Sequence, residues 1–161
     1  MFYDANAFNN GGNPMTEWNN SWDNTKDFGY MFYHAQNFNA DISGWNTSNI
    51  VDMTRMFSET DSFDQDLSGW DFSNVQLFTY QHPTNLRYYS LLTNARAFSD
   101  ENYGKLLVRL ADQYENEQLN GRVRFEANLC TPVGEAAAAA KTLLETENQW
   151  QIFDELTPQP A

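Results

Sequence analysis

The sequence predicts an α/β repeat solenoid that is closed at its C-terminal end by a helix–strand–helix–strand cap. Three observations predict this fold: a self-match at an offset of 25 residues, a longer third copy at the N-terminus, and helical patterning after Ser99. One unit of this length cannot bury its own apolar residues, whereas stacked copies share a continuous core. The 161 residues are enough to build such a core.

The self-match aligns residues 31–55 with residues 56–80. Chance would give about one or two identities over such a length, so a real period is indicated. The identical pairs are Met31/Met56, Phe32/Phe57, Phe38/Phe63, Asp41/Asp66, Ser43/Ser68, Gly44/Gly69, Trp45/Trp70, Ser48/Ser73, Asn49/Asn74 and Thr54/Thr79. Three further pairs are apolar in both copies: Ile42/Leu67, Ile50/Val75 and Met53/Phe78.

A third copy precedes these two. The stretch MFYDANAFN at the N-terminus matches MFYHAQNFN at residues 31–39 at six positions. Residues 1–30 are therefore copy 1, residues 31–55 copy 2 and residues 56–80 copy 3. Copy 1 carries an insertion around Asn10–Pro14, and its Gly-Gly with a nearby Pro predicts an outward loop.

Within a copy, no run keeps a helical or a strand period for long. We expect a short strand at Asp41–Trp45, a turn at Thr47–Asn49, and a short helical or 3₁₀ segment at Met53–Phe57. The repeated Asp and Ser-Asn residues also raise the possibility of calcium binding. Side-chain bonds to neighbouring backbone at each turn are the favoured interpretation, because no EF-hand-like spacing of oxygen ligands is present.

The C-terminal half follows a different pattern. Residues 81–98 are interpreted as an insertion or transition, residues 99–156 as the cap, and residues 157–161 as a tail. Ser99 is an N-cap candidate for a first helix that ends before Asn120-Gly121. The apolar stripe of this helix comprises Tyr103, Leu106, Leu107, Leu110 and Tyr114.

Three further elements complete the predicted cap. A short strand is expected at Arg122–Glu126, with Val123 and Phe125 on one side. Thr131-Pro132 is an N-cap and first-turn signal for a second helix through the run Ala136–Ala140, which we interpret as close helix packing. A last apolar edge follows at Trp150, Ile152 and Phe153.

Composition limits the possible partners. The net charge is −13, and residues 1–80 alone hold 11 acidic and 2 basic residues. Phosphate neutralisation needs the opposite sign, so nucleic acid and anionic membrane are not expected as partners. No apolar run is long enough to span a membrane, and the N-terminus does not resemble a signal peptide. The single Cys130 is interpreted as a packing residue.

No catalytic, cofactor-binding or metal-binding residues are expected. His34 and His82 have no evident partner, and His34 occupies a variable position held by Asp4 and Glu59 in the other copies. Asp61, Asp64 and Asp66 could form a glycosidase-like carboxylate cluster, but repeat turns explain them more simply.

The stretch MFYHAQNFNADISGWNTSNIVDMTRMF, residues 31–57, resembles the bacterial surface protein repeat of about 26 residues, a BspA-like relative of leucine-rich repeats. The stretches YGKLLVRLADQ, GEAAAAAKTLLE and QWQIFDE resemble the closing segment often found in such proteins. The resemblance implies a leucine-rich-repeat-like solenoid with adhesive or recognition roles at a surface. It implies no defined ligand and no catalytic residues.

Two functions follow as hypotheses. The first is a recognition or adhesion module for a protein or glycan, at an extracellular, cell-surface or virion location. Its binding face is expected to be the outward side of the predicted strands, with two Trp residues nearby. The candidate residues are Asp41, Ser43, Asp66, Ser68, Trp18 and Trp22.

The second hypothesis is a structural subunit of a virion, phage tail or surface layer. Copy 1 starts without an N-terminal cap, and an uncovered repeat edge is a surface that proteins normally cover. Either upstream sequence or a neighbouring chain is expected to cover it. The residues of this assembly edge are Met1, Phe2, Tyr3 and Phe8.

Overall fold

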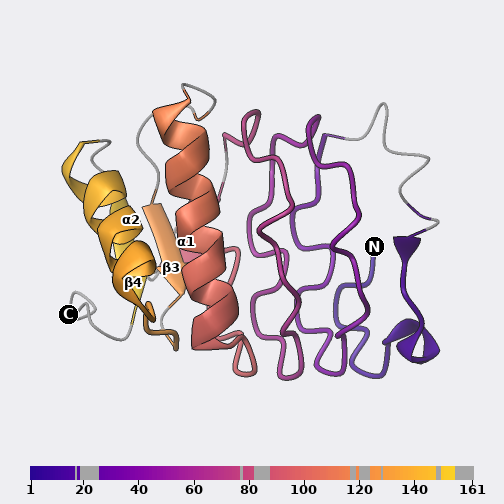
Figure 1. Cartoon of the computed structure of the whole chain (residues 1–161). Helices are drawn as coiled ribbons and strands as arrows, with labels where there is room; N and C mark the ends of the chain where they lie inside the picture. Colours follow the sequence, from indigo (N-terminus) through magenta and orange to yellow (C-terminus); the bar gives the residue numbers. More distant parts are fainter. Residues whose placement is uncertain are drawn as a thin grey trace.

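A computed structural model describes residues 1–16, 18, 26–76, 78–81, 88–116, 119, 124–127, 129–147 and 150–154. In Figure 1, the loops of successive copies lie side by side from the N-terminal segment towards helix α1, and helix α2 lies on the far side of α1. The N-terminal copy and the helices are thus at opposite ends of the molecule.

The elements occur in a fixed order along the chain. Copy 1 contains the 3₁₀ helix η1 (Asn10–Gly12), which lies within the predicted insertion. A hairpin of β1 (Thr79–Gln81) and β2 (Tyr88–Ser90) is antiparallel. The C-terminal region consists of α1 (Asp100–Glu115), β3 (Arg124–Ala127), α2 (Glu135–Thr146) and β4 (Gln151–Asp154). Strands β3 and β4 pair in parallel.

Equivalent backbone groups join neighbouring copies. The N–H groups of Phe2 and Phe32 donate to the carbonyls of Met31 and Met56, at 2.8 and 3.0 Å. Two residues further on, each copy has a non-glycine residue with φ between 56° and 61°, namely Asp4, His34 and Glu59, and Asn94, beyond copy 3, has φ of 59°. The left-handed conformation turns the chain at the same place in each copy.

Residues 91–98 continue this arrangement, which differs from the expected insertion over residues 81–98. Phe57 N–H donates to the Leu91 carbonyl at 3.0 Å, and the Phe98 ring stacks on Phe63 at 5.9 Å between centroids. The self-match missed this segment because Leu91 and Leu92 replace the Met-Phe pair. Strands β1 and β2 come between copy 3 and this segment, and residues 82–87 lie outside the described part.

Aromatic side chains fill the interior of the copies. Within copy 2, the rings of Phe32 and Phe38 stack at 3.7 Å, and Phe38 stacks on Phe63 of copy 3 at 5.9 Å. The indole N–H groups of Trp45 and Trp70 donate to the carbonyls of Met15 and Ile42, one copy back. Buried aromatic rings therefore carry both the apolar contacts and specific hydrogen bonds between copies.

The expected strand and helical segment inside a copy are not present. Asp41–Trp45 forms a turn without strand pairing, and Met53–Phe57 lies in irregular and turn structure. Arg55 has φ of 56°, which interrupts a right-handed helix. The N–H groups of Phe57 and Glu59 bond to the next segment, at Leu91 and Thr93, so they are not used in a helix.

The cap has the predicted order of helix, strand, helix and strand. Ser99 is the N-cap of α1 and its side chain accepts a hydrogen bond from Asn102 N–H, while Tyr103, Leu106, Leu107 and Leu110 are buried as expected. The predicted start of the second helix at Thr131 is wrong: α2 begins at Glu135 after Gly134, whose φ is 89°. Thr131 N–H instead donates to Asp100 Oδ1 at 2.7 Å.

The alanine run of α2 packs against α1, in agreement with its interpretation as close helix packing. Ala137 and Ala140 are buried. A Cβ atom placed on Gly104 of α1 would lie 3.2 Å from the Ala137 Cβ, so the two helices approach closely at this glycine. Cys130 is also buried, with its Sγ 3.6 Å from the Phe98 carbonyl oxygen. Of the strand residues expected to point inward, Phe125 is buried, while Val123 lies outside the described residues.

Candidate functional site: a tyrosine–arginine patch

The predicted binding-face residues take part in the turns of the copies. Asp41 Oδ1 accepts hydrogen bonds from the backbone N–H and the hydroxyl of Ser43, at 2.9 and 2.7 Å. Asp66 Oδ1 likewise accepts the Ser68 N–H at 2.8 Å. Since these residues do not lie on paired strands, they do not form the expected sheet face.

Of the two tryptophans expected on the binding face, the structure describes Trp18 but not Trp22. Trp18 N–H donates to the Met15 carbonyl, as Trp45 N–H does to Ile42, so Trp18 is the copy 1 equivalent of the core residue Trp45. Trp18 is half-buried and its ring lies 5.5 Å from that of Phe2. Trp22 lies outside the described residues.

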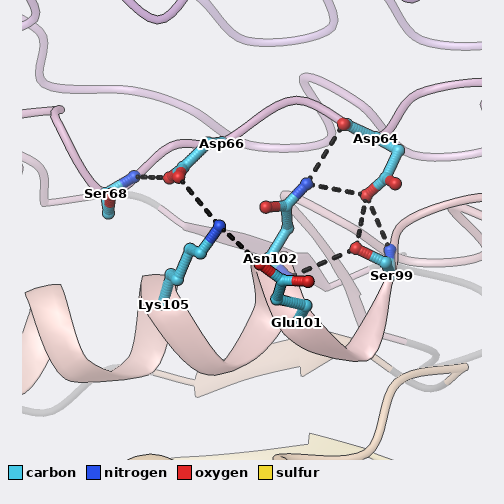
Figure 2. Close-up of polar contacts among 7 residues, drawn as sticks. All are labelled: Asp64, Asp66, Ser68, Ser99, Glu101, Asn102 and Lys105. Carbon is cyan, nitrogen blue, oxygen red and sulfur yellow. Dashed lines mark hydrogen bonds and ion pairs between the residues drawn. The ribbon is translucent and has the colours of Figure 1, made fainter.

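Asp64 and Asp66 connect copy 3 to helix α1 (Figure 2). Asp64 Oδ1 accepts hydrogen bonds from the Ser99 N–H, the Ser99 hydroxyl and the Asn102 amide, at 2.8, 2.7 and 2.9 Å. Asp66 Oδ2 lies 3.3 Å from Lys105 Nζ, which also lies 2.9 Å from Glu101 Oε1. These carboxylates thus hold the cap in place, and their geometry does not require a catalytic role.

Asp64 also ends a row of side-chain bonds between copies. Asn39 N–H donates to Asn9 Oδ1, Asp64 N–H donates to Asn39 Oδ1, and Ser99 N–H donates to Asp64 Oδ1, at 2.7, 2.9 and 2.8 Å. Each side chain satisfies a backbone donor of the next copy. The row passes from copy 1 to the N-cap of α1, so the repeats and the cap share one set of contacts.

We expect acid to destabilise the copies. Burial alone would raise the pKa of Asp71, but hydrogen bonds from Ser73 and Gln113 and the charge of Arg109 outweigh it and hold the pKa below its usual value. For Asp41, the hydrogen bonds from Ser43 lower the pKa. The unfolded chain then binds more protons, so this stabilisation is complete above the unfolded pKa of about 3.9 and is lost as pH falls through the lower folded pKa.

Urea denaturation at pH 7 and pH 3 measures this effect. The midpoint should fall at pH 3, and Asp71→Asn should reduce the difference between the two midpoints. Asp112→Asn on the outer side of α1 is the control, since its carboxylate is 58% exposed. Equal pH dependence in wild type and Asp71→Asn would contradict the assignment.

A hollow of about 570 Å³ lies next to the Asp66–Lys105 pair. Its apolar wall includes Val108 and Val133, which are 40% and 60% exposed. Its cations are already paired: Lys105 with Asp66 and Glu101, and Arg109 with Asp112. The hollow therefore offers apolar surface, and both of its cations already have a carboxylate partner.

A different surface gathers partly exposed aromatic rings around one cation. We define the tyrosine–arginine patch as Tyr3, Tyr30, Tyr33, Arg55 and Tyr89. The Arg55 Cζ lies 5.6, 5.0 and 3.5 Å from the ring centroids of Tyr30, Tyr33 and Tyr89. The Tyr3 ring lies 5.1 Å from Tyr33 and 6.5 Å from Tyr30. The patch thus combines residues of copy 1, copy 2 and strand β2.

Polar pairs run along one side of this patch. His34 Nδ1 lies 2.8 Å from Asp4 Oδ1, and the Asn94 amide donates to Glu59 Oε1 at 2.8 Å. These are the four residues with the shared left-handed conformation. Burial raises the pKa of Tyr33 and the charge of Arg55 only partly opposes this, so the phenol keeps its proton at neutral pH.

The predicted face did not include the patch. The sequence feature that could have indicated the patch is the repeated Met-Phe-Tyr of copies 1 and 2, in which Tyr3 and Tyr33 follow core phenylalanines. Of the residues expected to form the assembly edge, Met1 and Tyr3 are 79% and 55% exposed, and Phe2 and Phe8 are half-buried against the core.

In the described part of the chain, no group of three or more His, Cys, Asp or Glu side chains is arranged to hold a metal ion. Nor does any described helix have the length and apolar character needed to cross a membrane.

Comparison with known proteins identifies one family. Residues 1–101 match the family described as "Mycoplasma protein of unknown function, DUF285". The match covers the three copies, the segment 91–98 and the first residues of α1. The chain belongs to this family. No curated protein and no solved structure matches the sequence.

Proposed function

We propose that this chain is a leucine-rich-repeat-like solenoid, related to BspA-like surface protein repeats, that acts as a recognition or adhesion module. It binds a protein or glycan without catalysis, at an extracellular, cell-surface or virion location. Stacking of equivalent residues in copies 1–3 and in residues 91–98 supports the solenoid, through the shared backbone bonds and the phenylalanine stacks.

The tyrosine–arginine patch is the observation that carries the recognition role. Tyr and Arg are enriched at the energetic centres of protein interfaces, since they combine apolar area with polar groups. Tyrosine also loses little conformational entropy when a partner binds. Here the rings contact one another and Arg55, so their positions are fixed before any partner arrives.

The test is a binding screen of the whole chain against glycan and protein arrays and against bacterial and host cell surfaces. A ligand of the patch should bind at least roughly tenfold more weakly to the double variant Tyr3→Ser/Tyr33→Ser. The matched control is Val108→Ser/Val133→Ser at the hollow beside α1, which should leave binding unchanged. The absence of any ligand, or a ligand sensitive only to the control variant, would contradict recognition by the patch.

A structural role is the second candidate, and the exposed end of copy 1 favours it. The Met31 and Tyr33 carbonyls accept N–H groups from copy 1, whereas the equivalent residues Met1 and Tyr3 are 79% and 55% exposed. Phe2 and Phe8 are half-buried, whereas Phe32 is fully buried. Mass photometry of the isolated chain tests self-assembly through this end: oligomers that Phe8→Asp dissociates support it, and a stable monomer contradicts it.

A further inference from the structure

We propose that the tyrosine–arginine patch binds a basic protein segment, and that an arginine side chain of this partner packs against Tyr3 beside Asp4. The inference rests on the proposed recognition function and specifies the chemical class of the partner that the patch binds.

The chain itself shows how these rings hold a guanidinium. Arg55 lies against Tyr30, Tyr33 and Tyr89, with its Cζ within 5.6 Å of each ring centroid. A cation over an aromatic ring is attracted by the negative charge density of the ring face. Glu59, four residues after Arg55, adds a carboxylate whose charge acts on Tyr33, and it bonds to Asn94. In this chain, an arginine side chain is therefore held by tyrosine rings with a carboxylate nearby.

Tyrosine rings and a carboxylate also meet at Tyr3, but among the described residues no arginine of this chain is seen to pack against the Tyr3 ring. Tyr3 contacts Tyr30 and Tyr33 and remains 55% exposed. Its neighbour Asp4 has a side chain that is 53% exposed, with Oδ1 turned to His34. Asp4 is the positional equivalent of Glu59, as their φ values of 56° and 61° show. An incoming guanidinium would therefore meet an exposed ring and a carboxylate together.

The net charge of the chain favours a basic partner over an anionic polymer or a neutral glycan. The chain carries a net charge of −13, which raises the association rate of cations and opposes anionic polymers. Arginine suits the site better than lysine, because its planar guanidinium stacks on rings and is more weakly hydrated. A neutral glycan would gain nothing from the net charge.

The experiment is an NMR titration of the isotope-labelled whole chain with short peptides of alternating Arg-Gly and alternating Lys-Gly. The Arg peptide should shift the amide signals of Tyr3, Asp4 and His34 and bind about two- to fivefold more tightly than the Lys peptide. Tyr3→Leu and Asp4→Asn should each weaken Arg-peptide binding by about two- to fivefold. Asn tolerates the left-handed conformation of Asp4, so this substitution preserves the turn.

Asp112→Asn on α1 is the matched control, because it removes the same charge from a side chain that is 58% exposed. It should leave the Arg-peptide affinity within the error of the wild type. Equal binding of Arg and Lys peptides, insensitive to Tyr3→Leu, would overturn the inference. If a neutral oligosaccharide shifts the patch signals and the Arg peptide does not, the inference is wrong and the recognition function stands. If the screen and the titration both leave the patch untouched, both proposals are wrong.

Discussion

Replacing Phe57 with Ala should lower the free energy of unfolding by about 3–5 kcal/mol, the largest effect that we expect from a single substitution. Phe57 has no exposed surface and lies in the centre of the aromatic stack. Its ring contacts Phe63 at 3.9 Å, Phe32 at 5.8 Å and Trp70 at 6.1 Å. Removing it leaves a cavity between copies 2 and 3, which rigid neighbours on both sides cannot fill. Urea denaturation followed by tryptophan fluorescence measures the loss.

Phe8→Ala is the control, since it removes a ring of the same stack from copy 1 at its end. Phe8 is half-buried and contacts Phe2, Phe32 and Phe38 only towards copies 1 and 2. Its loss should cost clearly less than that of Phe57. Equal losses at the two positions would contradict a core in which burial increases towards the middle copies.

Asp64→Ala should cost about 2–3 kcal/mol, because one carboxylate oxygen serves three donors at the junction with α1. Asp64 is half-buried, which moderates the value of its charge-assisted bonds. Without it, the Ser99 N–H loses its acceptor, the Asn102 amide keeps only the backbone carbonyl of residue 64, and the Ser99 hydroxyl that caps α1 loses the group that orients it. Hydrogen exchange of the first turn of α1, together with urea denaturation, measures the effect.

Asp61→Ala provides the comparison for Asp64. Asp61 makes an ion pair with Arg96 at 2.7 Å, and the two side chains are 37% and 64% exposed. Such a surface pair contributes less than about 1 kcal/mol. Faster exchange in α1 is expected for the Asp64 variant alone; a similar increase in both variants would show that Asp64 does not anchor the cap.

The cap was largely predictable because its signals are local. Ser99 followed by acidic residues specifies a helix start, and the 3.6-residue spacing of Tyr103, Leu106 and Leu110 specifies the buried side. The start of α2 was misplaced because Thr131-Pro132 carries the same local signals. In the folded chain, the Thr131 N–H bonds to Asp100, which is distant in sequence.

The interior of the copies was less predictable, and the candidate site least of all. The N–H of Phe57 has its acceptor at Leu91, and no local propensity encodes a bond over that separation. Tyr3, Tyr33 and Tyr89 each look like ordinary half-exposed residues in the sequence. They become a patch only because Arg55 lies between rings contributed by different segments.

The sequence by itself determined the period of the copies, the membership of the aromatic core and the helical character of the cap. These follow from spacing and side-chain type, since equivalent residues at equal intervals must find equivalent environments. Only the tertiary structure decided that residues 91–98 continue the stack, that Asp64 and Asp66 bind the cap, and that the rings of Tyr30, Tyr33 and Tyr89 gather around Arg55. Those features depend on which backbone and side-chain groups of separate copies meet, and this is set when the copies pack against one another.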